Sequence, residues 1–357
     1  MSAAQPLALL LAGGTGGHVY PAMAVALELR ERGYRLGWVG TSRGLESRVV
    51  PEAGIELHTL PMRGIRGKGL LQQVQAIVML GWSLLASLAL MARRRPAVVI
   101  GMGGYASVPA ALAAWLLRRP LVLQEQNAVA GSANRNLARF ARRIVTGFPG
   151  VLTQHTQAEY LGNPIRREMI AAGERRDSEG VEGRALRILV LGGSLGARAL
   201  NEAMPRVAAA LGVSCEWHHQ CGAAHVEAAS AAYQAQGVTA QVLPFIEDMA
   251  EAYAWADLVV CRAGALTVAE LAVMACPSVL VPLPHAIDDH QTANARFLAD
   301  ADAAVLLPQT ELDSLEDCLR GLINQPSKLA AMAIAARGQA KPCATTDIAD
   351  RVEELVA

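Results

Sequence analysis

Two stretches of the sequence share one pattern, in which an apolar strand-like run leads through a glycine-rich turn into a helix-like run. The first is LLLAGGTGGHVYPA (9–22), and the second is ALRILVLGGSLGARALNEAM (185–204). The N–H groups of such a turn, and the positive end of the helix that follows it, attract anions. One such loop is a weak signal. Two of them, each opening a half of similar size, predict twin Rossmann-like α/β domains with a cleft between them.

The first glycine loop fits neither of two common phosphate-binding patterns. A Walker loop needs Lys followed by Ser or Thr after its last glycine, where this chain has His18-Val19. In the dinucleotide fingerprint the third glycine position falls on Val19, and the second strand-like run, 35–39, is followed by no acid that would bind a ribose. The loop alone therefore predicts either an anion site or tight backbone packing, and the histidine at its end is its unusual feature.

Strand-like runs alternate with helix-like runs along the chain, which predicts a parallel sheet flanked by helices in each half. The strand-like runs include 7–12, 35–39, 97–101, 120–123, 143–146, 186–191, 241–243, 257–261, 278–282 and 303–307. Between the two groups, the polar segment RREMIAAGERRDSEGVEGR is typical of a surface helix that runs into a linker. We therefore place the boundary within 162–184 and the domains at 1–163 and 164–343.

Bulk composition narrows the class of protein. The chain has 357 residues, of which 52% are hydrophobic and 18% charged, so it can bury a large core. A formal net charge of zero argues against a nucleic-acid binder that depends on phosphate attraction. The six cysteines form no Cys-x-x-Cys and are typical of reduced, buried thiols in a cytosolic protein. The first apolar run leads directly into the glycine loop, which favours a core strand over a signal peptide.

One stretch, 77–92, has no charged residue and is followed by Arg93-Arg94-Arg95. It is shorter than the roughly 20 residues that a spanning helix needs, so it predicts either a buried helix or an interfacial one. Trp82 within the run and the basic residues around it favour the interface, and Trp115–Arg119 has the same character. On a helix over 70–92, one stripe would present Val74, Val78 and Leu85, with Trp82 beside it, to an anionic membrane.

A further cluster lies at 261–295, after a strand-like run in the second half. Gly264 permits a tight turn, and a helix is predicted to follow it, with Thr267 and Glu270 in its early turns. The N–H groups at that helix start are suited to a phosphate, and the Glu270 carboxylate to a ribose diol. The alternative is that Glu270 is favoured there by the helix dipole alone.

Two histidines and two aspartates follow in a proline-containing loop: His285, Asp288, Asp289 and His290. Their spacing matches no tabulated zinc or calcium motif, so we expect no metal site there. Gln291 and Asn294 begin the next helix-like run and offer amides suited to a sugar.

Eight motifs, in order and at compatible spacing, resemble those of one family. They are GGTGGHVYPA, GMGGYASVPA, QEQNAVAG, GNPIR, GGSLGAR, FIEDM, CRAGALTVAE and HQTANA. The family is that of the bacterial N-acetylglucosaminyltransferases that convert lipid I to lipid II (the MurG family, in glycosyltransferase family 28), and the resemblance runs from about residue 7 to the C-terminus. Departures are Gln124, where some members have His, Leu195, where Gln is common, and Ala263, where Ser often stands. Leu195 lacks the amide, so no side-chain role is assigned to it.

The resemblance implies the GT-B fold: an α/β chain of two Rossmann-like domains whose parallel sheets face each other across a cleft. The N-terminal domain would bind the acceptor and the membrane, the C-terminal one UDP-N-acetylglucosamine, and a last helix at about 344–357, capped by Thr346-Asp347, would pack back on the first domain. The implied reaction moves N-acetylglucosamine, with inversion, to the muramyl 4-hydroxyl of lipid I. No cofactor is required. The implied location is peripheral, on the cytoplasmic face of the inner membrane, with cell-wall synthesis and division proteins as further partners.

The resemblance also implies roles for single residues. Either His18 or Glu125 takes the acceptor proton; for an isolated histidine, capping or packing at a helix start would be the preferred interpretation. Donor contacts are implied for Thr15, Gly16, Gly17, Asn127, Arg166, Ser194, Ile246, Ala265, Leu266, Thr267, Val268, Glu270 and Gln291. Acceptor contacts are implied for Gly13, Gly14, Gly103, Gly104 and Tyr105.

Two other functions use the same scaffold. One is a different sugar-nucleotide enzyme, either an epimerase or a transferase to another lipophilic acceptor. The other is a module that senses UDP-sugars at the membrane without turning them over. An epimerase has no use for an acceptor groove beside a membrane-docking surface, and a sensor would tolerate the loss of His18.

Overall fold

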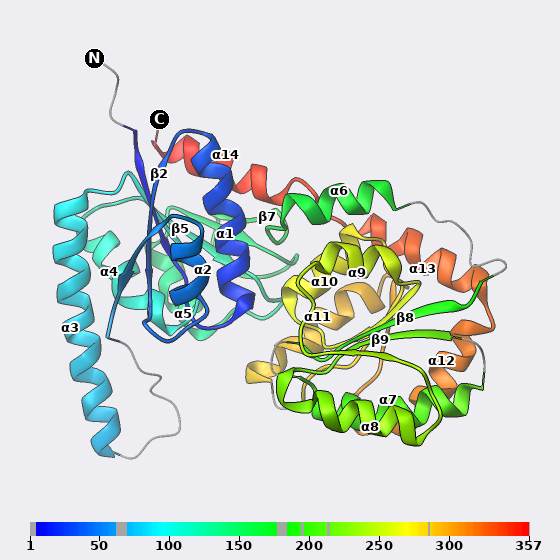
Figure 1. The fold of residues 1–357 in the computed structure, drawn as a ribbon. Helices are drawn as coiled ribbons and strands as arrows, with labels where there is room; N and C mark the ends of the chain where they lie inside the picture. Colours follow the sequence, from blue (N-terminus) through cyan, green and yellow to red (C-terminus); the bar gives the residue numbers. More distant parts are fainter. Residues whose placement is uncertain are drawn as a thin grey trace. The chain divides into compact units, whose positions relative to one another are not determined.

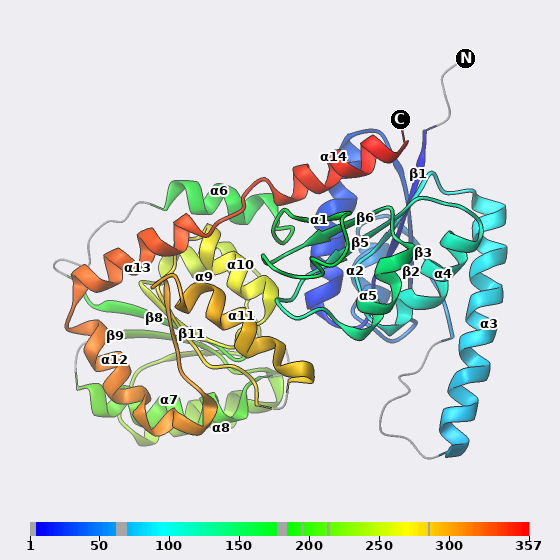
Figure 2. The ribbon, with the colours of Figure 1, turned by 180° about the vertical axis from the view of Figure 1, so that it is seen from behind.

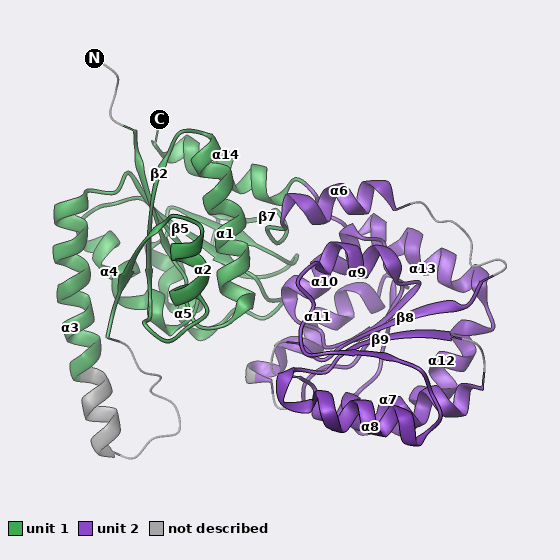
Figure 3. Ribbon diagram, viewed as in Figure 1, with its two compact units in different colours: residues 1–165, 343–357 green, residues 166–342 purple. Residues whose placement is uncertain are grey.

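The computed structural model describes residues 5–61, 70–176, 184–193, 196–212, 215–284 and 286–356; for 70–77 and Ile287 it describes the backbone without the side chains. The chain divides into two compact units (Figure 3). Unit 1 comprises residues 1–165 together with 343–357, and unit 2 comprises residues 166–342.

A seven-stranded parallel sheet forms the centre of unit 1, in the order β3-β2-β1-β4-β5-β6-β7. Its strands are β1 (Leu7–Leu11), β2 (Arg35–Gly40), β3 (Glu56–Thr59), β4 (Val98–Gly101), β5 (Leu121–Glu125), β6 (Arg143–Thr146) and β7 (Ala158–Tyr160). The helices are α1 (Gly16–Glu31), α2 (Glu46–Glu52), α3 (Leu70–Arg94), α4 (Val108–Leu116), α5 (Ser132–Leu137) and α14 (Ala344–Val356). Figures 1 and 2 show α1 and α14 on one face of the sheet, and α3 and α4 on the other.

The central strands form because they are continuous runs of Leu, Val and Ile, which suit a sheet covered on both faces. Leu10 and Ile100 from the strands are fully buried against Val25 of α1 and Ile348 of α14. Ion pairs hold α14 in place: Arg32 Nη1 lies 2.6 Å from Asp350 Oδ1 and 2.8 Å from Glu353 Oε2. The C-terminal helix therefore contributes to the core of unit 1, far from its own place in the sequence.

Two helix starts differ from the sequence prediction. The first helix was expected to follow the glycine-rich turn, but α1 begins inside that turn, at Gly16, with Thr15 as its N-cap residue. The glycine loop itself thus supplies the first helical turn. Thr346 was expected to cap the last helix, but α14 begins at Ala344, and the Thr346 hydroxyl donates back to the Cys343 carbonyl at 2.7 Å.

Unit 2 repeats the plan with a six-stranded parallel sheet in the order β10-β9-β8-β11-β12-β13. Its strands are β8 (Leu186–Leu191), β9 (Cys215–Gln220), β10 (Gln241–Leu243), β11 (Leu258–Cys261), β12 (Ser278–Leu280) and β13 (Ala304–Leu306). The helices are α6 (Arg167–Arg175), α7 (Arg198–Leu211), α8 (Val226–Ala235), α9 (Met249–Trp255), α10 (Ala265–Val273), α11 (His290–Ala299), α12 (Leu315–Ile323) and α13 (Pro326–Gly338). Within this unit, α7, α8 and α12 cover one face of the sheet, and α9, α10 and α11 cover the other (Figures 1 and 2).

The sequence allowed two interpretations of α3, a buried helix or an interfacial one. The structure excludes the buried helix. Val78 and Trp82 are each 66% exposed and Leu85 is 62% exposed, whereas Ser83 and Ser87 are fully buried. The buried face of the helix thus includes Ser83, Ser87 and Met91, while three large apolar side chains on its other face lie in solvent. Val74 lies among the residues whose side chains are not described. In the part of the chain that was searched, no helix is long and apolar enough to cross a membrane.

The six cysteines are free thiols, but the prediction that they are all buried is wrong. Cys221, Cys261 and Cys276 are buried, Cys343 is exposed, and the other two are half-buried. Burial raises the pKa of the Cys276 thiol to about 11, so it stays protonated at neutral pH.

Candidate active site

In unit 1, two glycine loops meet at the carboxyl ends of β1 and β4, where the strand order reverses direction. Such a reversal point is where open α/β sheets bind ligands. Gly103 and Gly104 have φ values of 85° and 79°, a conformation that side chains rarely adopt. A Cβ on Gly104 would lie 3.5 Å from the Gly13 carbonyl oxygen, so the two loops touch through their backbones.

His18 lies in the first turn of α1 and is half-buried beside these loops. A Cβ on Gly103 would be 3.3 Å from His18 Cε1, so the imidazole packs directly on the second glycine loop. On its other edge, Nδ1 is 3.1 Å from Gln126 Oε1, in the segment that follows β5. The ring is held between two loops and directed to the end of the sheet where a ligand is expected.

Glu125, the other candidate proton acceptor, is buried and engaged at both oxygens. Oε1 accepts from the Asn127 N–H at 3.0 Å and from Asn127 Nδ2 at 3.4 Å. Oε2 accepts from the Gly131 N–H at 3.0 Å and from Asn134 Nδ2 at 2.9 Å. A carboxylate that organises its own loop in this way is a poor acceptor for a substrate proton, so the geometry favours His18 for that role.

Glu46, at the start of α2, is a buried residue that sequence reasoning missed. Its carboxylate accepts from the Gly14 N–H at 2.9 Å, from the Thr41 N–H at 2.8 Å and from the Thr41 hydroxyl at 2.7 Å. A Cβ on Gly13 would lie 2.5 Å from Glu46 Oε1, which explains the glycine there by packing. The Gly14 N–H is therefore engaged from behind the loop and does not point to a ligand.

In unit 2, Glu270 lies in α10, beside the carboxyl ends of the strands, and is buried. The Tyr253 hydroxyl donates to its Oε2 at 3.3 Å, and Arg166 Nη2 lies 3.9 Å from its Oε1. Burial raises the pKa of Glu270 to about 7, although Arg166 and the Tyr253 hydrogen bond each oppose that shift. Burial beside this carboxyl also raises the pKa of Tyr253 well above its usual range.

The start of α10 is suited to an anion for reasons of backbone geometry. Gly264 is its N-cap residue, and a glycine has no side chain that could cap the first turn. The N–H groups of a first turn have no partner inside the helix. The prediction included Val268, but its N–H donates to the Gly264 carbonyl at 2.9 Å and belongs to the helix ladder. If this helix start binds an anion, we therefore expect the contacts to come from the N–H groups before Val268.

The other predicted unit 2 residues lie around the same sheet end. Gln291 is the second residue of α11, and its Oε1 accepts from the Leu283 N–H at 2.9 Å. Ile246 is 9% exposed in the segment between β10 and α9. Arg262, which sequence reasoning missed, donates to the Val281 and Pro282 carbonyls at 3.1 Å and so anchors the loop before α11. Ser194 lies outside the described residues.

The remaining predicted residues belong to unit 1. Thr15, Gly16 and Gly17 form the N-cap and first turn of α1. Asn127 is tied to Glu125 through both its backbone and its side chain, and Tyr105 is 49% exposed at the start of a 3-10 turn. The residues predicted to bind the donor are thus divided between the two units.

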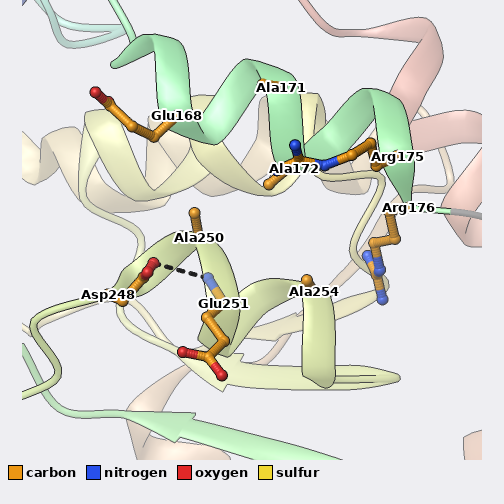
Figure 4. A pocket seen from close by; sticks show the side chains of 9 residues that line it. All are labelled: Glu168, Ala171, Ala172, Arg175, Arg176, Asp248, Ala250, Glu251 and Ala254. Atoms are coloured by element: carbon orange, nitrogen blue, oxygen red, sulfur yellow. Dashed lines mark hydrogen bonds between the residues drawn. The ribbon is translucent and has the colours of Figure 1, made fainter.

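A groove between α6 and α9 lies within unit 2, apart from these residues (Figure 4). Its floor is made of alanines such as Ala172 and Ala250, and Asp248 caps α9 by accepting from the Glu251 N–H at 2.9 Å. Arg176 at one end donates to the Met274 and Ala275 carbonyls. None of the residues predicted to bind donor or acceptor lines this groove.

Acidic, histidine and cysteine side chains do not gather into a group of three that could hold a metal ion among the residues searched. Asp288, Asp289 and His290 lie at the start of α11, and His285 is outside the described part.

Comparison with known domains gives the family. Residues 8–146 match the glycosyltransferase family 28 N-terminal domain, and residues 187–352 match the glycosyltransferase family 28 C-terminal domain. This chain belongs to glycosyltransferase family 28. The two matched domains correspond to the two sheets, one in each unit.

Members of family 28 and their structural neighbours are similar over nearly the whole chain. A protein of Alkalilimnicola ehrlichii, named UDP-N-acetylglucosamine–N-acetylmuramyl-(pentapeptide) pyrophosphoryl-undecaprenol N-acetylglucosamine transferase, is 50% identical over 96% of both chains. The crystal structure of Acinetobacter baumannii MurG is 38% identical, with a TM-score of 0.82 over 98% of this chain and 99% of that one. A putative UDP-N-acetylglucosamine 2-epimerase from Listeria monocytogenes is 14% identical with a TM-score of 0.68, over 99% of this chain and 97% of that one, and so shares the fold alone. The fold is GT-B, as the sequence motifs predicted.

Proposed function

We propose that this protein transfers N-acetylglucosamine from UDP-N-acetylglucosamine to the muramyl 4-hydroxyl of lipid I, the undecaprenyl-diphosphate-linked MurNAc-pentapeptide, and so makes lipid II for peptidoglycan. The observation that carries this proposal is the 50% identity, over 96% of both chains, to a relative named for that transfer.

The reaction is a single displacement that inverts the anomeric carbon. It needs a base at the attacking hydroxyl and positive charge at the departing diphosphate. His18, held at the glycine loops of unit 1, is the base. As the C–O bond to the acceptor forms, the bond between the sugar and UDP breaks, and the hydroxyl proton passes to the imidazole.

The donor binds at the start of α10 in unit 2. The N–H groups of that helix start and Arg166 face the diphosphate, and Glu270 accepts from both hydroxyls of the ribose. Ile246 contacts the uracil through its backbone, and Gln291 offers its amide to the sugar. Because the helix dipole and Arg166 supply positive charge, the transfer proceeds without a divalent metal ion or another cofactor.

The apolar face of α3 docks on the cytoplasmic surface of the inner membrane. Val78, Trp82 and Leu85 are exposed, and Trp115 and Leu116 of the neighbouring α4 are 47% and 50% exposed. Arg93, Arg94 and Arg95 at the end of α3 would meet anionic headgroups. An acceptor with a lipid tail would then reach the glycine loops from the bilayer.

Release of UDP by the pure protein tests this proposal. UDP should appear from UDP-N-acetylglucosamine only when a lipid I analogue is present. Conversion of UDP-N-acetylglucosamine without any acceptor would instead identify an epimerase, and a soluble sugar replacing the lipid-linked acceptor would identify a different transferase. Binding of the donor without turnover would identify a sensor.

A further inference from the structure

A chain of buried side-chain amides lies behind His18 in unit 1. Gln126, which follows β5, is 1% exposed, Gln124 at the end of β5 is fully buried, and Asn163 after β7 is 2% exposed. Gln126 Oε1 is the atom that faces His18 Nδ1, at 3.1 Å. The sequence motif QEQNAVAG contains both glutamines, but the proposed function has so far used neither.

The orientation of Gln126 follows from its neighbours. Its Nε2 donates to the Met102 carbonyl at 2.8 Å and also to Gln124 Oε1. A backbone carbonyl can only accept, so the amide nitrogen must face Met102 and the amide oxygen must face His18. Because the amide is buried, reversing it would set two oxygen atoms against each other without water to relieve the contact.

The same logic fixes the rest of the chain. Gln124 Nε2 donates to Asn163 Oδ1 at 3.0 Å, and Asn163 Nδ2 donates to the Gln126 carbonyl at 2.9 Å. The chain of amides therefore ends on two backbone carbonyls, those of Met102 and Gln126. Each amide also fixes which end of its neighbour must donate and which must accept.

We infer that Gln126 is a positioning residue that holds His18 as the Nδ1–H tautomer. Since Gln126 Oε1 accepts, His18 Nδ1 must donate, and the neutral imidazole then carries its lone pair on Nε2. This inference rests on the proposed function for its catalytic meaning: the acceptor hydroxyl gives its proton to Nε2, and the resulting imidazolium keeps its Nδ1–H on Gln126 while UDP departs.

The position of Nε2 agrees with this role. A Cβ on Gly104 would lie 3.9 Å from His18 Nε2, so the glycine loop passes close to this nitrogen. The loop carries no side chain at this point, so no side chain of Gly104 covers Nε2. In the other tautomer Nε2 would donate to the hydroxyl and could not take its proton.

The substitution that tests the inference is Gln126→Met, which keeps the length of the side chain and removes the acceptor oxygen. Gln126→Glu is the rescue variant: at this buried position its carboxyl is expected to be protonated, so that its hydroxyl donates to the Met102 carbonyl and its other oxygen accepts from Nδ1. Gln157→Met is the matched control: Gln157 also lies in unit 1 and donates to the Ala138 and Ala141 carbonyls, away from His18.

The tautomer is read directly by NMR of the full-length protein labelled with ¹⁵N-histidine, with the His18 signals assigned by their loss in His18→Gln. We expect wild type, Gln126→Glu and Gln157→Met to show a protonated Nδ1 and an unprotonated Nε2. Gln126→Met should show the Nε2–H form. A wild-type His18 protonated at Nε2, or one tautomer common to wild type and Gln126→Met, would overturn the inference. The measurement on wild type tests the inference even if Gln126→Met does not fold.

A kinetic arm separates this inference from the proposed function. Gln126→Met should lower kcat about tenfold or more while leaving the KM for UDP-N-acetylglucosamine unchanged, because part of the general-base contribution is lost. An unchanged kcat would contradict the inference. The NMR results could agree with the assigned tautomer while neither wild type nor any variant transfers sugar to a lipid I analogue. In that case the proposed function would be wrong, and the assignment of the tautomer would still hold.

Discussion

At the scale of single residues, the clearest contrast lies between the two candidate bases of unit 1. The His18 side chain is hydrogen-bonded to Gln126, whereas the Glu125 carboxylate receives four donors from its own loop. The sequence could mark His18 as unusual because it ends a glycine loop. It gave no means of choosing between the two residues, because that choice depends on hydrogen bonds made by Asn127, Gly131 and Asn134.

Replacing His18 with Ala should lower turnover by about a hundredfold or more, the usual contribution of a general base. The affinity for UDP should stay near that of the wild type, because the imidazole is not part of the nucleotide site. Steady-state rates with a lipid I analogue and calorimetric titration with UDP would measure the two quantities. A variant that keeps more than about a third of wild-type turnover would leave His18 with a structural role only.

The carboxyl of Glu270 predicts a pH dependence for donor binding. With a pKa raised to about 7 by burial, it is largely neutral below that pH and ionised above it. Only the ionised form accepts strongly from both ribose hydroxyls, so the affinity of wild type for UDP should rise as the pH increases through 7 and then level off.

Glu270→Gln should remove that rise in affinity and weaken donor binding at pH 8 by about 1.5–3 kcal/mol, seen mainly as a higher KM for the donor. Titration of both proteins with UDP between pH 5.5 and 8.5 makes the comparison. Parallel curves with equal affinities would mean that Glu270 serves only its helix.

Sequence reasoning missed Glu46, and the reason is physical. Its partners Gly14 and Thr41 lie in two different loops, and its burial follows from the close approach of those loops. A glutamate at the start of a short helix is also favoured by the helix dipole, so nothing in the local sequence distinguishes it.

At the scale of elements, strands were predictable where both faces of the sheet are covered. β1, β8 and β11 are rich in Leu, Ile and Val, and their bounds lie within one or two residues of the prediction. The edge strands β3 and β7 and the polar strand β9 were missed. β9 has the sequence CEWHHQ, and its fully buried His219 is paired with Tyr233 and Asn201. A buried histidine satisfied by distant partners leaves no apolar pattern to recognise.

The packing of α6 on α10 gives a prediction for one glycine. A Cβ on Gly173 would lie 2.4 Å from the Val273 carbonyl oxygen, so Gly173→Ala must push the two helices apart. We expect a loss of roughly 1–3 kcal/mol in the free energy of unfolding. Weaker donor binding should accompany it, since Arg166 precedes α6 and Glu270 belongs to α10.

Gly321→Ala in α12 is the control for Gly173→Ala, because the added Cβ meets no atom of the described structure within 4 Å. It should stabilise its helix by up to about 1 kcal/mol. Urea unfolding of both variants gives the comparison. Equal free energies of unfolding would show that α6 and α10 can move apart without a loss of stability.

At the scale of the whole molecule, the repeated glycine-rich turn predicted two halves, and each half has a parallel sheet whose strand order reverses beside its first strand. The family resemblance, and not any local sequence pattern, predicted that the last helix packs on the first domain. The contacts that hold α14 to unit 1 join residues far apart in the chain, such as Arg351 Nε and Glu159 Oε2 at 2.8 Å. Such pairs have no signal in a single sequence.

The exposed face of α3 predicts how the molecule meets a membrane. Replacing Val78 and Leu85 together with Glu should weaken binding to anionic vesicles, because apolar side chains at the interface become charged. Turnover of a soluble acceptor analogue should remain intact. Ile334→Glu is the control, since Ile334 is 76% exposed on α13, which belongs to unit 2 and not to the proposed docking face. Vesicle binding equal to that of wild type in a co-sedimentation assay would remove the docking role from this helix.

The central claim is an inverting transfer of N-acetylglucosamine to lipid I, and the stereochemistry of the product tests it most directly. The pure protein would be incubated with UDP-N-acetylglucosamine, whose sugar is α-linked, and a lipid I analogue, and the new glycosidic bond would be assigned by proton NMR. A single displacement assisted by His18 predicts a β-linked disaccharide on the muramyl 4-hydroxyl, formed in step with UDP. An α-linked product, or UDP released without any disaccharide, would contradict the account.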